Sequence, residues 1–194
     1  MNKDEILSGL YTFLIENIPN EALTLIIQND IRVENFFSIY SGVYLNNLLE
    51  NNLINNYSFQ HTILLENPRR AHIDIMFVDN NIQTTYLELK HFSITQNRGN
   101  GRNLNFYTSN TLEGKKVGIV GDCMKLDNLR EIGYIPDEIN LVCLAFITHR
   151  PTQEQFNNME IRLNNHPELF DWNITYPIPI ENQGNDLGFF TLQK

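Results

Sequence analysis

Two apolar runs of the sequence, separated by a short turn-forming stretch, most constrain how this chain can fold. The runs cover about residues 71–78 and 84–92, and Asp-Asn-Asn at 79–81 lies between them. Such a pattern predicts a β-hairpin. Both faces of each predicted strand are largely apolar, which is typical of strands in the interior of a sheet. A charged residue within these strands is therefore expected to be at least partly buried.

Three charged residues nevertheless lie inside this predicted hairpin. Asp74 is in the first strand, and Glu88 and Lys90 are in the second. Because side chains alternate between the two faces of a strand, Glu88 and Lys90 share a face with Tyr86 and Phe92. Burying charges between such neighbours is costly unless the charges pair or hold a metal. Two carboxylates and one ammonium together suggest a divalent-cation site for phosphodiester chemistry.

Two simpler interpretations of these charges stay open. Glu88 and Lys90 are separated by two positions, so they could form a surface pair on a solvated face. The apolar neighbours on the same face argue against that interpretation. The charges could also form a buried structural salt bridge.

The pattern resembles the motif of the PD-(D/E)XK nuclease superfamily, which has the restriction-endonuclease-like fold. The family motif is an Asp late in one strand, followed on the next strand by Glu or Asp, one variable residue and Lys. Asp74 and Glu88-Leu89-Lys90 match that motif. Ile73 stands where the family name has proline, so this chain departs from the motif at that position.

The same resemblance implies an architecture for the chain. It covers about residues 33–150 of a single domain that spans 1–194. The implied fold is α/β, with a central mixed β-sheet flanked by helices, an αβββαβ core, extra N-terminal helices and C-terminal strands. The residue patterns predict helices near 3–17, 21–30, 33–51, 121–132 and 152–165, and strands near 57–65, 71–78, 84–92, 139–149, 172–180 and 187–192.

Glu34 is the candidate for a further acidic residue of the site. It lies in the same i, i+3, i+7 row of the predicted helix 33–51 as Phe37 and Ser41, which predicts that it turns inward. By the resemblance, a glutamate on the first core helix often completes the metal site. The helix dipole alone also favours an acid near a helix N-terminus, so both interpretations stay open. Val43 is predicted to lie on the buried side of this helix.

The predicted helix 121–132 carries a second possible contribution to the site. Its sequence is similar to an Asp-x-x-Lys-Leu helix that follows the catalytic hairpin in several nuclease-like families, which would turn Asp122 and Lys125 toward the site. The spacing alone predicts an i, i+3 surface pair. Ile132 is predicted on the apolar side of the helix. His91 directly follows the motif lysine, so it points to the opposite face and is predicted to be structural.

The resemblance implies a metal-dependent endonuclease-like hydrolase that cleaves phosphodiester bonds. Asp74, Glu88 and the Leu89 main-chain carbonyl would hold Mg²⁺, or alternatively Mn²⁺, with Glu34 as a further ligand. Carboxylate and carbonyl oxygens are the ligands that these hard cations prefer. The ion would polarise the phosphate and lower the pKa of bound water. Lys90 would orient that water or stabilise the phosphate.

Charge is distributed unevenly along the chain. The net charge of −9 argues against a general nucleic-acid binder. Between residues 90 and 116, however, the chain has five basic residues and a single acid, Glu113. We expect this segment to contact nucleic acid, DNA ahead of RNA, although an ordinary solvated loop has the same composition.

Other function classes find little support, and two rivals to a nuclease stay open. The chain has neither a G-x-S-x-G nucleophile elbow nor an H-x-x-x-H zinc pair. One rival is a catalytically inactive nuclease-fold module that binds nucleic acid or a protein partner, and the other is an unrelated partner-binding α/β domain. A homodimer is an open alternative, and family analogy suggests genome defence or a mobile element.

The expected compartment is the cytoplasm. Cys123 and Cys143 show no metal-ligand spacing and are predicted to be small buried residues in a reducing environment. The first ten residues lack the apolar core of a secretory signal. No apolar stretch approaches the ~20 residues of a membrane span, so we expect no membrane partner.

Overall fold

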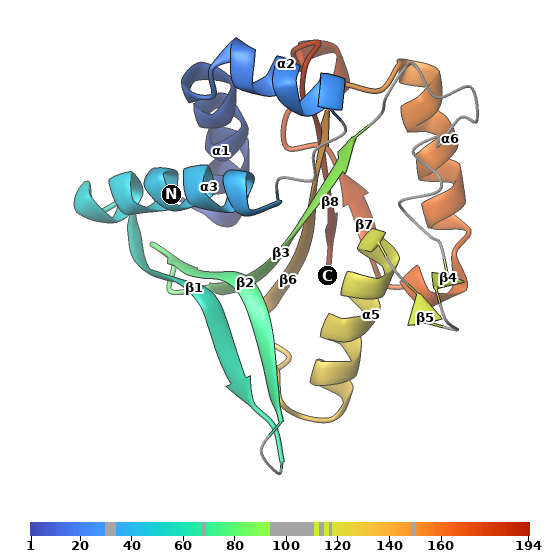
Figure 1. Cartoon of the computed structure of the whole chain (residues 1–194). Coiled ribbons are helices and arrows are strands. Elements are labelled where there is room, and N and C mark those ends of the chain that lie inside the picture. Colours follow the sequence, from blue (N-terminus) through green and yellow to red (C-terminus); the bar gives the residue numbers. More distant parts are fainter. Residues whose placement is uncertain (30–33, 67–68, 94–110, 113–114, 117, 149) are drawn as a thin grey trace.

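A six-stranded mixed β-sheet lies between two layers of helices (Figure 1). The structure, a computed structural model, describes residues 1–29, 34–66, 69–93, 111–112, 115–116, 118–148 and 150–194. Its elements are α1 (Lys3–Asn17), α2 (Asn20–Asn29), α3 (Glu34–Glu50), β1 (Ile54–Leu64), β2 (Arg70–Asp79), β3 (Thr84–Ser93), β4 (Thr111–Leu112), β5 (Lys115–Lys116), α5 (Gly118–Glu131), β6 (Asn140–Thr148), α6 (Gln153–Asn164), the 3-10 turn η1 (Pro167–Leu169), β7 (Asn173–Thr175), the 3-10 turn η2 (Ile180–Asn182) and β8 (Gly188–Gln193).

The strand order across the sheet is β1-β2-β3-β6-β8-β7. β3 and β6 run parallel, and the other neighbours in the sheet are antiparallel. The connection from β3 to β6 passes through α5, as a parallel pair requires a crossover. These pairings confirm the predicted mixed sheet and the predicted position of the buried strand β6 beside the hairpin.

Each face of the sheet packs against its own hydrophobic core. β6 is buried along its length, and its alternate side chains enter the two cores. Leu144 and Phe146 pack on the side of α1, α2 and α3, whereas Cys143 and Ala145 pack on the side of α5 and α6. Figure 1 shows these two groups of helices on opposite sides of the sheet. Leu89 of β3 belongs to the first core.

The turn of the β2–β3 hairpin is built as its residues predict. Asp79 ends β2 and is 3 % exposed. Its Oδ1 atom accepts hydrogen bonds from the backbone N–H groups of Asn81 and Gln83, at 2.8 and 3.0 Å. A short acidic side chain that satisfies nearby backbone donors in this way stabilises a turn. The predicted hairpin is therefore confirmed.

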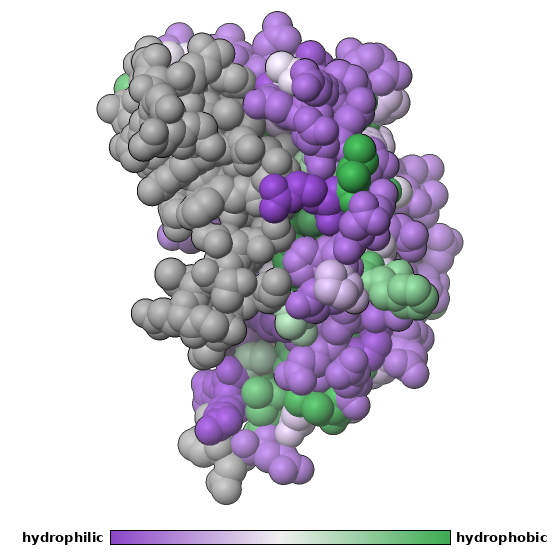
Figure 2. Space-filling view, turned by 90° about the vertical axis from the view of Figure 1, so that its right-hand side faces the viewer, coloured by the Kyte–Doolittle hydropathy of each residue, from purple (hydrophilic) through white to green (hydrophobic). Residues whose placement is uncertain are grey.

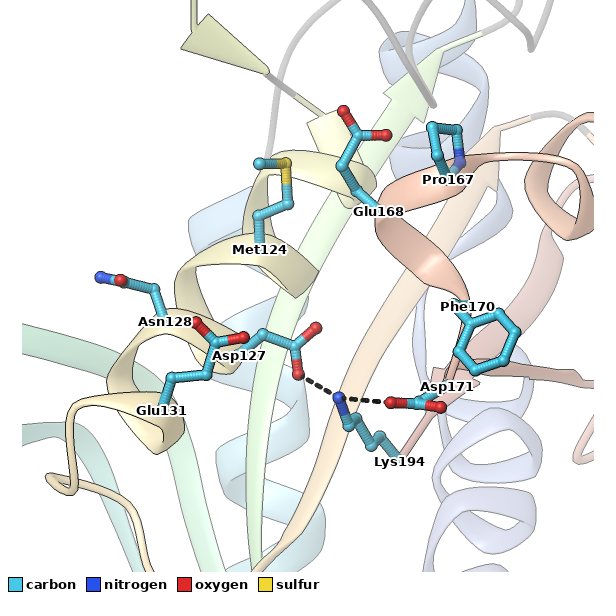
Figure 3. Close-up of a pocket in the computed structure, with 9 residues that line it drawn as sticks. All are labelled: Met124, Asp127, Asn128, Glu131, Pro167, Glu168, Phe170, Asp171 and Lys194. Atoms are coloured by element: carbon cyan, nitrogen blue, oxygen red, sulfur yellow. Dashed lines mark hydrogen bonds and ion pairs between the residues drawn. The ribbon is translucent and has the colours of Figure 1, made fainter.

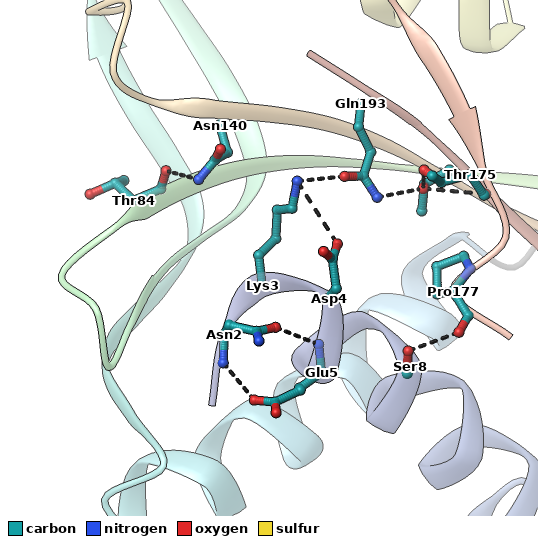
Figure 4. A network of polar contacts seen from close by, with 11 residues as sticks. Asn2, Lys3, Asp4, Glu5, Ser8, Thr84, Asn140, Thr175, Pro177 and Gln193 are labelled. Carbon is teal, nitrogen blue, oxygen red and sulfur yellow. Dashed lines mark hydrogen bonds and ion pairs between the residues drawn. The ribbon is translucent and has the colours of Figure 1, made fainter.

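Helix α1, near the start of the chain, contacts the C-terminal segment (Figure 4). It starts with a capping box in which the Asn2 side chain accepts from the Glu5 N–H and the Glu5 carboxylate accepts from the Asn2 N–H. Further along, its polar side chains reach the C-terminal segment. These contacts run from Lys3 Nζ to Gln193 Oε1, from Ser8 Oγ to Pro177 O at 2.9 Å, and from the Tyr11 hydroxyl to Leu187 O at 3.3 Å.

Several predicted boundaries differ from those of the structure. Helix α5 begins at Gly118, three residues before the predicted start at 121. β7 covers only Asn173–Thr175, because Pro177 and Pro179 follow and a proline cannot donate a ladder hydrogen bond. The short β4–β5 pair was not expected from the sequence. The remaining helices and strands lie within about three residues of their predicted ranges.

Two side chains predicted to be buried are exposed. Val43 is 48 % exposed, because α3 buries the side that carries Phe37, Ser41 and Tyr44 and turns Val43 away from it. Ile132 is 54 % exposed, because α5 has already ended at Glu131. Both predictions were therefore wrong. Helical spacing indicates which apolar residues share a stripe, but not which of them other elements cover.

The coloured part of the surface seen from the α6 side is mostly hydrophilic. Figure 2 shows hydrophobic side chains there only in small separate patches. Scattered apolar residues of this kind are normal on protein surfaces. Within the described ranges, no helix combines the length and the apolar character that a membrane span needs.

Candidate active site

Charged side chains from three elements meet on the face of the sheet that α5 covers. Asp74 comes from β2, Glu88 and Lys90 from β3, and Asp122 and Lys125 from α5. Glu88 pairs with Lys125 and Lys90 pairs with Asp122, so the two α5 residues face the hairpin instead of each other. Asp74 interacts electrostatically with both Glu88 and Asp122. We refer to these five residues as the charged cluster.

Asp74 lies where the β2 and β3 backbones part. The antiparallel ladder joins Ile75–Val78 to Thr84–Leu87, and β3 then continues beside β6 alone. The Oδ2 atom of Asp74 accepts a hydrogen bond from the Leu89 N–H at 2.8 Å. The carboxylate thus takes the place of a strand acceptor and satisfies a donor that the parting of the strands leaves open. This bond fixes Asp74 next to the strand that carries Glu88.

Glu88 is the most deeply buried acid of the charged cluster, with 5 % of the residue exposed. Its Oε1 atom lies 2.6 Å from Lys125 Nζ, which also donates to the His72 carbonyl at 2.7 Å. Burial raises the pKa of Glu88 to about 7. The Lys125 ammonium opposes this rise, and the carboxylates of Asp74 and Asp122 add to it.

Glu88 should therefore make folding depend on pH when no metal is bound. A carboxyl whose pKa is raised in the folded protein binds its proton more tightly there than in the unfolded chain. The free energy of unfolding should thus fall as pH rises from about 4.5 to about 7. Glu88→Gln removes this loss and should be more stable than the parent at pH 8, by on the order of 2–3 kcal/mol.

Urea unfolding in EDTA at pH 4, 6 and 8 measures this difference between parent and variant. Glu138→Gln serves as the control, because Glu138 is an exposed acid outside the charged cluster. A Glu88→Gln protein whose stability follows the parent at every pH would contradict the expectation.

Lys90 is held between two acids. Its Nζ atom lies 3.1 Å from Asp122 Oδ2 and 3.5 Å from Glu34 Oε1. Burial alone lowers the pKa of Lys90, but the two acids outweigh burial, and the net pKa lies above the ordinary value. Burial raises the pKa of Asp122, and Lys90 opposes that rise. Lys90 therefore stays protonated at neutral pH, which suits a group that stabilises negative charge.

Glu34 lies at the rim of the charged cluster. It is the first residue of α3, and its side chain is 46 % exposed, so it is less inward than the helical row predicted. Its Oε1 atom reaches Lys90 and also accepts from the His91 N–H at 3.4 Å. The helix glutamate thus contacts the motif lysine, and its role as a metal ligand stays a prediction.

His91 points away from the charged cluster, as predicted. It is 5 % exposed and stacks on Phe37 of α3, with ring centroids 5.3 Å apart. Its Nε2 atom lies 2.9 Å from the Thr148 hydroxyl. These contacts fasten β3 to the α3 layer and give His91 a structural role.

The donor chemistry of the charged cluster suits a hard divalent cation. Asp74 and Glu88 each engage one carboxylate oxygen in the bonds above, and their mutual repulsion is what a cation would relieve. Over the residues that the structure describes, no three His, Cys, Asp or Glu side chains are arranged to hold a metal ion. A bound ion would thus depend on two carboxylates with main-chain or solvent oxygens, and the Leu89 carbonyl stays a prediction for one of these.

The structure describes only part of the basic segment 90–116. Residues 94–110, which include Arg98 and Arg102, lie outside the described residues. The prediction that this segment contacts nucleic acid therefore stays a prediction. Lys90, at its beginning, is itself a member of the charged cluster.

A separate pocket lies between α5 and η1 (Figure 3). Its volume is about 410 Å³, and acids make up much of its wall. Lys194 extends into it and lies 2.7 Å from Asp127 and 3.5 Å from Asp171. Asp127 also accepts from the Trp172 indole at 2.6 Å. The pocket shares no residue with the charged cluster.

No protein-family model, curated protein or solved structure matches this chain. The resemblance to PD-(D/E)XK nucleases therefore depends on the motif residues and on the arrangement around them. Sequence reasoning missed the bond from the Leu89 N–H to Asp74, because no residue pattern signals where two strands part. The Asp122 and Lys125 contacts had a signal in the helix that follows the hairpin.

Proposed function

We propose that this chain is a metal-dependent nuclease that cleaves phosphodiester bonds, with DNA ahead of RNA as the substrate. One observation supports this most directly. Asp74 and Glu88 lie on adjacent antiparallel strands and interact with each other, and Lys90 follows on the same face as Glu88. Burial raises the pKa of Glu88 beside two other acids, which is a feature that functional sites often share.

The order of the elements also supports the proposal. α3, β1, β2, β3, α5 and β6 follow one another as helix, three strands, helix, strand, with the small β4–β5 pair inserted before α5. This is the αβββαβ order of the restriction-endonuclease-like core. α1 and α2 precede that core, and α6, β7 and β8 follow it.

The residues of the charged cluster would divide the work as follows. Asp74 and Glu88 would hold Mg²⁺ or Mn²⁺, which when bound polarises a phosphate and supplies a hydroxide nucleophile. Lys90, kept protonated by Asp122, would stabilise the negative charge that develops on the phosphate. Lys125 would neutralise Glu88 and present a second ammonium, 36 % exposed, at the same place. Two ammonium groups would help an anionic substrate approach an acidic protein.

A cleavage panel tests the proposal. The parent protein is incubated with single- and double-stranded DNA and RNA in Mg²⁺, Mn²⁺ or EDTA, and products are separated on denaturing gels. We expect cleavage of at least one substrate that requires the divalent ion and that Asp74→Asn abolishes. Asp137→Asn is the matched control, because the Asp137 side chain is 99 % exposed and lies outside the charged cluster. Cleavage by Asp74→Asn at the parent rate would overturn the proposal.

A second candidate function is a nuclease-fold module that binds nucleic acid or a protein partner without cutting. The half-exposed Glu34 and the net charge of −9 favour it. A parent protein that binds oligonucleotides but leaves every substrate of the panel intact would select this candidate.

A further inference from the structure

Strand β1 contains a strained residue beside the charged cluster. Gln60 has a φ of 48°, in the left-handed region that residues other than glycine seldom adopt. The residues on either side of Gln60 pair with Ile75 and Ile73, which places Gln60 opposite Asp74 in the sheet. Strain of this kind costs stability and is retained where the surroundings enforce it, often at functional sites.

The strained residue brings three polar side chains into a row. Residues three positions apart point to opposite faces of a regular strand, yet Ser58 Oγ lies 3.5 Å from His61 Nδ1. The left-handed residue between them is what lets them meet. On the other side of the ring, His61 Nε2 lies 3.2 Å from the Tyr86 hydroxyl, and the two rings are tilted with centroids 5.2 Å apart. The row thus crosses from the edge strand β1 to β3.

This row lies next to the two carboxylates. Tyr86 is two residues before Glu88 on the same face of β3, and it pairs across the hairpin with Met76, two residues after Asp74. The step between the two rows is about 7 Å along the strands. Ser58, His61 and Tyr86 are all partly exposed, so their polar atoms are not confined to the core.

We propose that Tyr86, positioned by His61, binds the sugar–phosphate backbone of a nucleic-acid strand next to the phosphate that would be cleaved at Asp74 and Glu88. This inference rests on the proposed nuclease function and names how that site holds its substrate. When His61 Nε2–H donates to the Tyr86 hydroxyl oxygen, that hydroxyl keeps its own proton for a phosphate oxygen, and such a contact sets the position of a strand without reading its sequence. The hydrogen bond between the two side chains, together with Gln60, holds the Tyr86 hydroxyl in place beside the charged cluster.

The test compares three variants of the full chain, Tyr86→Phe, His61→Ala and His61→Gln. kcat and KM are measured with Mg²⁺, and the Kd for a fluorescein-labelled oligonucleotide is measured by anisotropy in an Asp74→Asn background. Tyr86→Phe should raise KM and Kd about tenfold, because it loses a hydrogen bond to a charged group. His61→Ala should raise both severalfold, because the Tyr86 hydroxyl loses the side chain that positions it. kcat should change less than about twofold, since neither side chain contacts the reacting atoms. His61→Gln keeps an amide that can bond the Tyr86 hydroxyl, so it should lose less than His61→Ala.

Tyr57→Phe is the matched control. Tyr57 is also on β1, but its hydroxyl donates to Asn46 Oδ1 at 3.1 Å toward the α3 side, so KM and Kd should not change. Thermal unfolding of each variant separates a folding defect from a binding defect.

The other possible outcomes distinguish a failure of this inference from a failure of the nuclease proposal. Parent-like KM and Kd in Tyr86→Phe and His61→Ala, or a loss confined to kcat, overturns this inference and leaves the nuclease proposal standing. A parent that binds the oligonucleotide but cuts nothing ends the nuclease proposal, and the Kd comparison then still decides whether Tyr86, positioned by His61, holds the strand. A parent that neither binds nor cuts overturns both.

Discussion

Lys90→Ala, Asp74→Ala and Glu88→Ala should each lower the rate of Mg²⁺-dependent cleavage by about 10²-fold or more. Removing either carboxylate takes away a ligand for the cation, and removing Lys90 takes away a positive charge that opposes the charge developing on the phosphate. Single-turnover cleavage of the best substrate from the panel measures the loss. Glu138→Ala, an exposed acid outside the charged cluster, is the control and should cut at the parent rate.

The two carboxylate variants should differ in stability. Asp74→Ala leaves the Leu89 N–H without its acceptor and should cost about 1–3 kcal/mol. Asp74→Asn keeps an oxygen that can accept this bond, so it should lose activity with little loss of stability. Glu88→Ala removes an acid that burial disfavours, and it should be no less stable than the parent at pH 8. A folded Lys90→Ala protein that cuts as fast as the parent would contradict the assigned role of the lysine.

Phe37→Ala should lower the free energy of unfolding by about 3–5 kcal/mol, the largest stability change that we expect from a single substitution. Phe37 is fully buried and joins α3 to the sheet. Its ring stacks on Phe146 of β6, with centroids 4.5 Å apart and planes within 8°, and on His91 of β3. Truncation opens a cavity between these rings and loosens the helix that carries Glu34.

Urea unfolding followed by circular dichroism measures the effect of Phe37→Ala. Phe170→Ala is the control, because Phe170 is 91 % exposed and its removal should change stability by less than about 0.5 kcal/mol. A loss below about 1 kcal/mol in Phe37→Ala would mean that α3 is not held to the sheet by this stack.

The hairpin and the buried strand β6 could be predicted because their residues leave few alternatives. Asp79 has the short acidic side chain that a turn uses, and the runs on either side of it are too apolar to lie at the surface. The exposed positions of Val43 and Ile132 could not be predicted in the same way. Whether an apolar helix residue is covered depends on which other elements pack there, and the spacing within the helix does not contain that information.

The residues of the charged cluster could be predicted from the sequence, but the ion pairs between them could not. Alternation along β3 puts Glu88 and Lys90 on one face, and the structure agrees. That Lys125 pairs with Glu88 depends on how far α5 lies from the sheet, which only the packed structure determines. The raised pKa of Glu88 follows from its burial, which again belongs to the tertiary structure. The hydrogen bond from the Leu89 N–H to Asp74 forms where β2 and β3 separate. The alternation of apolar residues indicates where a strand lies, but not where it separates from its neighbour.

The contacts of α1 have a consequence for how the protein is made. Its side chains reach partners 169 to 190 positions away, at Pro177, Leu187 and Gln193. A ribosome adding about 5–20 residues per second would need roughly ten seconds or more to produce those partners. During that time α1 lacks these partners, so the helix can complete its contacts only after the C-terminal segment has been synthesised.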